Sequence, residues 1–130
     1  MASTPSAASS PSSSAKPAKI PGTFSLVLPA HNEEENIRIV VERALEKLPC
    51  FADNFEIIVV NDGSRDHTGQ IIDELGREHS EVKPQHHKVN RGYGGALTTG
   101  FNASTGDYVM FMDADRQFDI VDLGLLSPFI

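Results

Sequence analysis

The chain has 130 residues, 39% of them hydrophobic, and a formal net charge of -7 at pH 7. These values fit one small domain with a packed core and exclude disorder of the whole chain. Binding to nucleic acid needs clustered lysine and arginine, so an acidic chain of this kind is expected to have no nucleic-acid partner. The single cysteine, Cys50, excludes an internal disulfide and suits a reducing compartment.

The N-terminal residues differ in composition from the rest. Residues 1–20 are rich in Ser, Ala and Pro and carry almost no large apolar side chain, which predicts a disordered tail. No apolar run approaches the roughly 20 residues that span a bilayer, and the N-terminus lacks the apolar centre of a signal peptide. We therefore expect a cytoplasmic protein whose folded part covers residues 21–130.

From residue 23 onward the pattern alternates between strands and helices. Apolar runs predict strands at 24–29, 55–60 and 107–112. A weaker strand at 81–89 is expected at a sheet edge, because Pro84 has no amide hydrogen to donate. Helical periodicity predicts helices over 32–48, 66–79 and 94–105. Asn32 is the expected N-cap of the first helix and Gly106 the expected stop of the third.

Strands that alternate with helices imply a parallel sheet with right-handed crossovers. We therefore predict an α/β fold, a Rossmann-like open and mostly parallel sheet with helices on both faces. Ligands of such sheets bind outside the carboxyl ends of the strands. Each predicted strand is followed by a polar cluster, in the order "PAHNEEE", "NDGSRD", "NRGYGGA" and "DADRQ". The sequence thus predicts one binding site along one edge of the sheet.

The cluster after the last strand holds Asp113, Asp115 and Gln117. Carboxylates at positions i and i+2 of an extended chain point to the same side, so both can face one cation. Oxygen ligands of this kind suit Mg²⁺ or Mn²⁺, which bind jointly with substrate phosphates and stabilise a departing diphosphate. In the alternative interpretation, Asp113 caps the following turn and Asp115 is solvated.

The two middle clusters also have two interpretations each. Asp62 can accept hydrogen bonds from a nucleoside base or ribose, but its segment is also a common strand-to-helix turn. The "NRGYGGA" segment can place backbone N–H groups near an anion, with Arg91 as a candidate phosphate contact. Its glycines, Gly95 among them, can equally serve a tight turn and close helix packing.

The histidines do not form a zinc pattern. His86 and His87 are adjacent and point to opposite faces of a strand, and no cysteine pair accompanies them. Only His31 lies at the edge of the predicted site. The other histidines are expected to have structural or solvated roles.

Three segments, "LVLPAHNEEENI", "EIIVVNDGSRDHT" and "NRGYGGALTTGFNASTGDYVMFMDADRQFD", occur in this order and spacing. Together they resemble the nucleotide-sugar half of a glycosyltransferase family 2 enzyme with the GT-A fold, over residues 24–119. The polyprenyl- and dolichyl-phosphate sugar transferases are the most similar in style. The resemblance implies a metal-assisted inverting transfer from a UDP- or GDP-sugar to a polyprenyl or dolichyl phosphate or a glycan.

The resemblance also assigns roles to residues that match the family motifs. The residues expected to contact the nucleotide sugar are Pro29, Asn32, Glu33, Asp62, Arg91, Gly95 and Asp113. The residues expected to hold Mg²⁺ or Mn²⁺ are Asp113, Asp115 and Gln117, of which the two aspartates are also the expected catalytic residues.

Some positions depart from the family pattern, and other functions stay open. Asn61 stands where the family usually has an acidic residue, His31 where it often has Tyr, and Arg116 where Leu is common. Family members normally continue well beyond the metal motif, so we expect a donor-binding part that is truncated at its C-terminus. Membrane contact is then expected only through the missing segments or a lipid acceptor, at the cytoplasmic face.

Two alternative functions follow from these observations. The first is a truncated, non-catalytic fragment that binds nucleotide sugars. The second is an aspartate-based phosphatase or phosphoreceiver, which fits less well because a D-x-D phosphatase motif normally follows the first strand.

Overall fold

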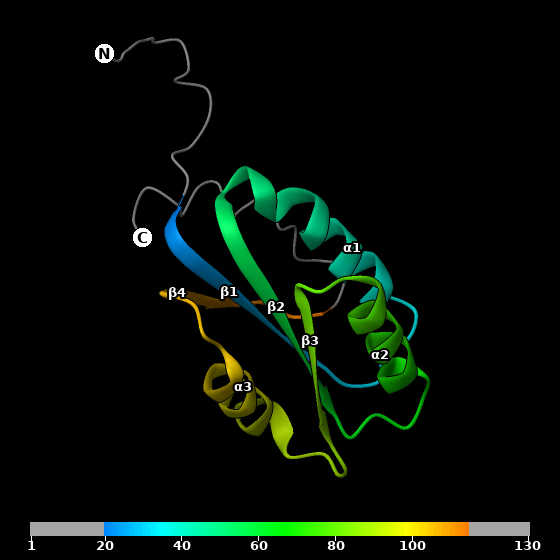
Figure 1. Ribbon diagram of the computed structural model, residues 1–130. Helices are drawn as coiled ribbons and strands as arrows, with labels where there is room; N and C mark the ends of the chain where they lie inside the picture. Colours follow the sequence, from blue (N-terminus) through cyan, green and yellow to red (C-terminus); the bar gives the residue numbers. More distant parts are fainter. Residues whose placement is uncertain (1–19, 115–130) are drawn as a thin grey trace, which may run out of the picture.

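The computed structural model describes residues 20–114 (Figure 1). The elements in this range are β1 (Ile20–Ala30), α1 (Ile37–Lys47), the 3-10 helix η2 (Leu48–Cys50), β2 (Ala52–Asp62), α2 (Thr68–Glu78), β3 (Val82–His87), α3 (Gly92–Ala103) and β4 (Tyr108–Phe111). Apart from Ile20, the predicted tail at 1–20 lies outside the described residues. Among the helices in the described range, none is long and apolar enough to cross a membrane.

The described strands form one sheet in the order β3-β2-β1-β4. All three pairings are parallel, which confirms the predicted open α/β sheet, and β3 with Pro84 lies at an edge as expected. The chain runs outward from β1 to β2 and β3 and then returns to place β4 on the other side of β1. The strand order therefore reverses between β1 and β4, and ligand sites of open sheets form at such a reversal.

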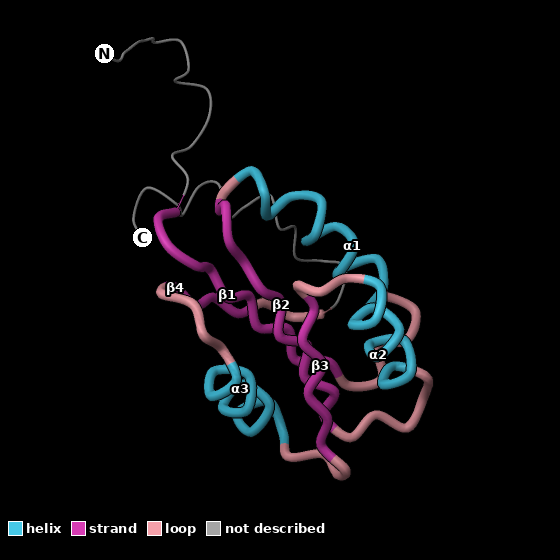
Figure 2. Tube along the Cα trace, viewed as in Figure 1, coloured by secondary structure: helices cyan, strands magenta, loops and turns pink. Residues whose placement is uncertain are grey.

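Helices cover both faces of the sheet (Figures 1 and 2). Helices α1 and α2 lie on one face and α3 lies on the other. Successive side chains of a strand point to opposite faces, so Leu26 and Leu28 join the larger core cluster with α1 and α2, whereas Val27 joins a smaller cluster with α3. Because both faces are covered, β1 and β2 are apolar at consecutive positions.

Two glycines allow α3 and the turn after it to approach β1 closely. A Cβ atom on Gly100 would collide with Val27, and one on Gly106 would lie 2.5 Å from Ser25 Oγ. The expected role of Gly106 as a helix stop is wrong, since α3 ends before Ser104, whose backbone is extended. Gly106 instead donates its N–H to Ser25 Oγ at 2.8 Å, which joins this turn to the amino half of β1.

The predicted start of the first helix is also wrong. Helix α1 begins at Ile37 with Asn36 at its N-cap, and its first turn carries no acidic residue. Asn32 lies before the helix with a φ of 54°, a left-handed conformation that asparagine tolerates better than most residues. The residues from His31 to Asn36 thus form a loop over the end of the sheet, where they can take part in a site.

Candidate functional site

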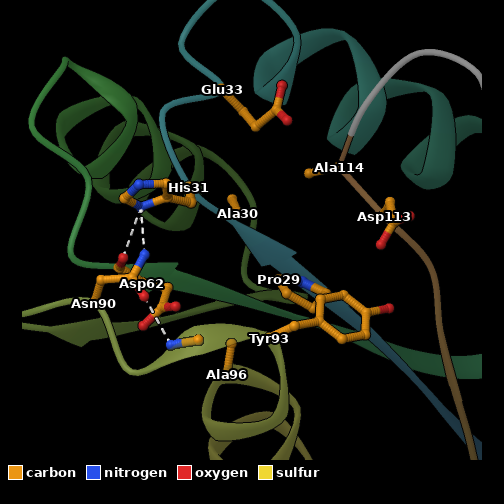
Figure 3. A pocket seen from close by; sticks show the side chains of 11 residues that line it. Pro29, Ala30, His31, Glu33, Asp62, Asn90, Tyr93, Ala96, Asp113 and Ala114 are labelled. Carbon is orange, nitrogen blue, oxygen red and sulfur yellow. Dashed lines mark hydrogen bonds between the residues drawn. The ribbon is translucent and has the colours of Figure 1, made fainter.

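A cavity of about 240 Å³ opens at the carboxyl edge of the sheet, where the loops after β1, β3 and β4 meet the end of β2 and the start of α3. Four residues predicted for the site line it, namely Pro29, Glu33, Asp62 and Asp113. Figure 3 shows His31, Asp62 and Asn90 at one end of the cavity and Tyr93 with Asp113 at the other. The fold thus brings together carboxylates that are far apart in sequence.

Asp62 forms the floor of one end of the cavity. The residue is only 4% exposed, and its Oδ1 accepts a hydrogen bond from the Arg91 backbone N–H at 2.8 Å and lies 2.7 Å from His87 Nδ1. Burial raises the pKa of Asp62, but the hydrogen bonds from Arg91 and His87 outweigh it, so the pKa lies below its usual value. At neutral pH Asp62 is therefore an ionised hydrogen-bond acceptor.

Asp113 and Tyr93 form the opposite end of the cavity. Asp113 follows β4 and is exposed, and the side chains of the two residues lie near one another in Figure 3. Burial, followed by the hydrogen bond and the charge of Asp113, raises the pKa of the Tyr93 hydroxyl. At neutral pH Tyr93 stays protonated, and its hydroxyl can donate a hydrogen bond to a carboxylate or to a ligand oxygen.

The loop after β1 is held to the segment after β2 by hydrogen bonds between backbone N–H groups and side-chain oxygens. Asn32 donates its N–H to Ser64 Oγ at 3.0 Å and accepts from the Arg65 N–H at 2.9 Å. Glu33 donates its N–H to Thr68 Oγ1 at 2.8 Å. These bonds leave Glu33 on the cavity wall, whereas Asn32 lines a neighbouring hollow of about 470 Å³.

His31 lines both hollows, and its ring nitrogens contact three groups. Nδ1 lies 2.9 Å from the backbone oxygen of Asp62 and 3.2 Å from the side-chain nitrogen of Asn90. Nε2 lies 3.3 Å from the side-chain nitrogen of Asn32. The ring is thus fixed at the boundary between the two hollows, beside the end of β2.

Like Asn32, two further predicted contacts, Arg91 and Gly95, lie outside the cavity lining. Arg91 is exposed and reaches the site through its backbone N–H, not through its guanidinium group. A Cβ atom on Gly95 would lie 2.7 Å from Arg91 Cβ, so the glycine makes room for the stem of this side chain. Their roles in binding a nucleotide sugar stay predictions.

The predicted metal ligands are only partly described. Asp113 lies on the cavity wall, but Asp115 and Gln117 lie outside the described residues. Within residues 20–114, no three His, Cys, Asp or Glu side chains are grouped to hold a metal ion. Asp113 fits a metal role because it is an exposed oxygen donor facing a cavity, and Mg²⁺ and Mn²⁺ prefer such ligands.

Sequence reasoning missed three residues of the site region. Tyr93 and Asn90 lie in the "NRGYGGA" segment, in which only the glycines and Arg91 were considered. His87 was expected to be structural or solvated, but it lies beside Asp62 in the register of β2 and β3 and is 5% exposed. The available signal was the position of all three residues at or just after the end of a parallel strand.

The fold, an open parallel sheet with helices on both faces, is that of the GT-A glycosyltransferases. The chain belongs to glycosyl transferase family 2, because the sequence model of that family matches residues 25–129. A dolichyl-phosphate beta-glucosyltransferase ALG5D of Trichomonas vaginalis is 36% identical over 108 residues, which are 79% of this chain and 33% of that protein. The resemblance inferred from the motifs is thereby confirmed.

Solved structures agree with this assignment. TarS 1-349 of S. aureus in complex with UDP-GlcNAc has a TM-score of 0.68 at 26% identity, over 83% of this chain and 31% of that chain. A mannosyltransferase of Pyrobaculum calidifontis, in complex with GDP-Man and Mn²⁺, has a TM-score of 0.69 at 22% identity, over 82% of this chain and 32% of that chain. The chain spans 16% to 33% of the length of the curated relatives it matches.

Proposed function

We propose that this chain is the donor-binding part of a glycosyltransferase that moves a sugar from a UDP- or GDP-sugar to a polyprenyl or dolichyl phosphate. The observation that carries the proposal is the convergence of Asp62 and Asp113 on one cavity at the strand reversal. The names of the relatives support it, since one acts on dolichyl phosphate and two structural neighbours hold GDP-Man and UDP-GlcNAc.

The nucleoside is assigned to the end of the cavity that holds Asp62. An ionised carboxylate only accepts hydrogen bonds, and uracil, guanine and ribose all present N–H or O–H donors. Because Asp62 is buried and held through its Oδ1, it can meet such a donor with little reorganisation. His31 and Asn90 line the same end and contribute further polar groups.

The diphosphate is assigned to the other end, near Asp113 and the start of α3. The cavity is lined by the carboxylates of Glu33, Asp62 and Asp113 and by no Lys or Arg side chain of the described residues. A diphosphate needs a counter-charge in such surroundings, which supports the use of Mg²⁺ or Mn²⁺. Asp113, with Asp115 and Gln117, would hold the ion, which supplies electrostatic stabilisation of the leaving diphosphate.

A lipid phosphate suits this site as the acceptor. Its oxygen is already ionised, so the attack on the anomeric carbon requires no general base. In one displacement with inversion, the bond from this carbon to the acceptor oxygen forms while the bond to the diphosphate breaks, and UDP or GDP leaves. The membrane enters the proposal through the lipid acceptor, at the cytoplasmic face.

Titration calorimetry of the full chain with UDP and with GDP tests the proposal. Mn²⁺ or Mg²⁺ should raise the affinity for one of the nucleotides by about tenfold, roughly 1.4 kcal/mol. The double variant Asp113→Asn with Asp115→Asn should lose this gain. The control Asp73→Asn, which changes an exposed carboxylate of α2, should keep it. Nucleotide affinity that does not respond to metal in the parent would contradict the proposal.

A transfer assay separates an enzyme from a binding fragment. The protein is incubated with the nucleotide sugar whose nucleotide it binds, with a short-chain polyprenyl phosphate and with metal. Formation of the lipid-linked sugar and free nucleoside diphosphate supports transferase activity of this chain. Tight binding without transfer and without donor hydrolysis would favour the non-catalytic alternative.

A further inference from the structure

One buried histidine beside the cavity has no part in the function proposed above. His87 is the last residue of β3, and its side chain is 3% exposed. The register of the sheet sets it directly next to Asp62, the last residue of β2. A buried imidazole in contact with a buried carboxylate at a binding cavity calls for an explanation beyond packing.

The hydrogen bonds of His87 connect three elements. Nδ1 lies 2.7 Å from Asp62 Oδ1, and Nε2 lies 2.7 Å from Thr99 Oγ1 in the second turn of α3. Asp62 Oδ1 also accepts the backbone N–H of Arg91, just before α3. The imidazole ring at the end of β3 thus contacts the end of β2 and α3, and Asp62 binds the residue just before α3.

The tautomer of His87 follows from its partners. An ionised carboxylate only accepts, so Nδ1 carries the proton that is donated to Asp62. In the neutral ring Nε2 is then an acceptor, and it receives the hydroxyl proton of Thr99. Thr99 thus holds the orientation of the His87 ring, and the ring holds the orientation of the Asp62 carboxylate.

Two of the hydrogen bonds to the carboxylate fall on one oxygen. His87 and the Arg91 N–H both bind Oδ1, and the Gly92 N–H also favours the ionised carboxylate. A carboxylate has about four lone-pair sites, so it can still accept from a donor group of a ligand in the cavity. Without the His87 bond the carboxylate can rotate about its Cβ–Cγ bond and loses one of the donors that favour its ionised form. The direction and the charge of Asp62 therefore both depend on this ring.

We propose that His87, supported by Thr99, is a positioning residue that orients the Asp62 carboxylate toward the nucleoside of the donor. This inference rests on the proposed function, because it takes Asp62 as the group that contacts the base or ribose. His87 itself does not line the cavity. Its effect is therefore expected in the binding of the nucleotide and not in the bond-breaking step.

A matched pair of variants tests the proposal in the full chain. In His87→Asn the amide nitrogen takes the place of Nδ1 and can still donate to Asp62, whereas in His87→Gln the amide takes the place of Nε2 and keeps only Thr99. Calorimetry with UDP and GDP in the presence of Mg²⁺ should show about tenfold weaker binding for His87→Gln. Binding by His87→Asn should stay within about threefold of the parent.

The pH dependence gives a readout that a purely structural role would not move. Nucleotide affinity should fall in acid when Asp62 takes up a proton. Loss of the His87 donor removes a bond that favours the ionised form, so the fall should begin at a higher pH in His87→Gln than in the parent. The control His86→Gln changes the adjacent exposed histidine, which binds Asp73, and should match the parent in affinity and pH profile.

The ¹⁵N spectrum of the histidine rings provides a second measurement that requires no folded variant at position 87. The parent should show His87 with its proton on Nδ1, and Asp62→Asn should shift that signal. A proton on Nε2 alone would overturn the inference, even if His87→Gln failed to fold. His87→Gln that folds and binds nucleotide like the parent would also overturn it, while the proposed function would stand. A parent that binds neither nucleotide overturns both.

Discussion

The two buried carboxylates of β2, Glu56 near the middle of the strand and Asp62 at its carboxyl end, differ in their surroundings. Glu56 accepts hydrogen bonds on Oε2 from Ser25 Oγ at 2.6 Å and from the Thr105 N–H at 2.6 Å. Its donors belong to β1 and to the turn before β4. Asp62, at the carboxyl end, is held on one oxygen and faces a cavity. One strand thus carries a carboxylate that is hydrogen-bonded within the framework and a second carboxylate that faces the candidate site.

The largest expected effect is the loss of stability in Glu56→Ala. The substitution leaves the hydroxyl of Ser25 and the N–H and hydroxyl of Thr105 without their acceptor, so we expect a loss of about 3 kcal/mol in the free energy of unfolding. Denaturant titration measures it, with Glu46→Ala, an exposed change on α1, as the control. A loss below about 1 kcal/mol would show that the framework role is overstated.

A smaller and different effect is expected at the carboxyl end of the strand. Asp62→Asn keeps an oxygen that can accept from the Arg91 N–H but removes the charge that a nucleoside donor would meet. We expect nucleotide affinity to fall by roughly thirtyfold, about 2 kcal/mol, with a loss of stability near 1 kcal/mol. Calorimetry and denaturant titration of the same sample check both numbers. If Asp62→Asn costs only stability, the two carboxylates do not differ in role.

The dependence of stability on pH sharpens the comparison further. Burial raises the pKa of Glu56, but hydrogen bonds from Ser25 and Thr105 outweigh it, so the folded-state pKa lies below the usual value. The stabilisation is therefore present above the unfolded-state pKa and is lost as the pH falls through the folded-state pKa. The stability gap between the parent and Glu56→Gln should narrow on acidification, as followed by unfolding at several pH values. A gap that stays constant would contradict this.

The smallest expected effect concerns charges that are not buried. Arg38 contacts Glu42, Glu74 and Glu78 at 3.1 to 3.3 Å, but every one of these side chains is at least 36% exposed. Surface ion pairs are screened by water and salt, so Arg38→Ala should cost no more than about 1 kcal/mol. Unfolding at low and at high salt checks this, because the difference should shrink in 1 M salt. A salt-independent loss would indicate packing by the arginine stem.

The alternation of apolar runs and helical periodicity was sufficient to predict the sheet, because strands covered on both faces are apolar at consecutive positions. The start of α1 was not predictable from local preference. Asn32 is a good N-cap in isolation, yet its N–H donates to the Ser64 hydroxyl and its side-chain oxygen accepts from the Arg65 N–H, more than thirty residues away. The local helix propensity of a segment contains no information about a distant part of the chain that binds the segment in the fold.

The sequence predicted one part of the candidate site and missed another part for a similar reason. Asp62 and Asp113 follow apolar strands, so their meeting at one edge could be inferred from sequence. The contact of His87 with Asp62 could not be inferred, because the sequence does not give the register between β2 and β3. Only the register shows that His87, and not its neighbour His86, lies against Asp62.

Pro84 makes the two edge strands of the described sheet, β3 and β4, unequal in their ability to pair with an additional strand. Ile57 of β2 donates its N–H to the backbone oxygen of Glu81, just before β3. The backbone N–H and C=O groups of successive strand residues point to opposite sides, so in β3 those of the odd-numbered residues point toward β2. The backbone nitrogen of Pro84, which carries no hydrogen, therefore points away from β2, and an added strand would lack a hydrogen-bond donor at this position. The described part of β4 contains no proline, so assembly by edge addition should be directed to that border.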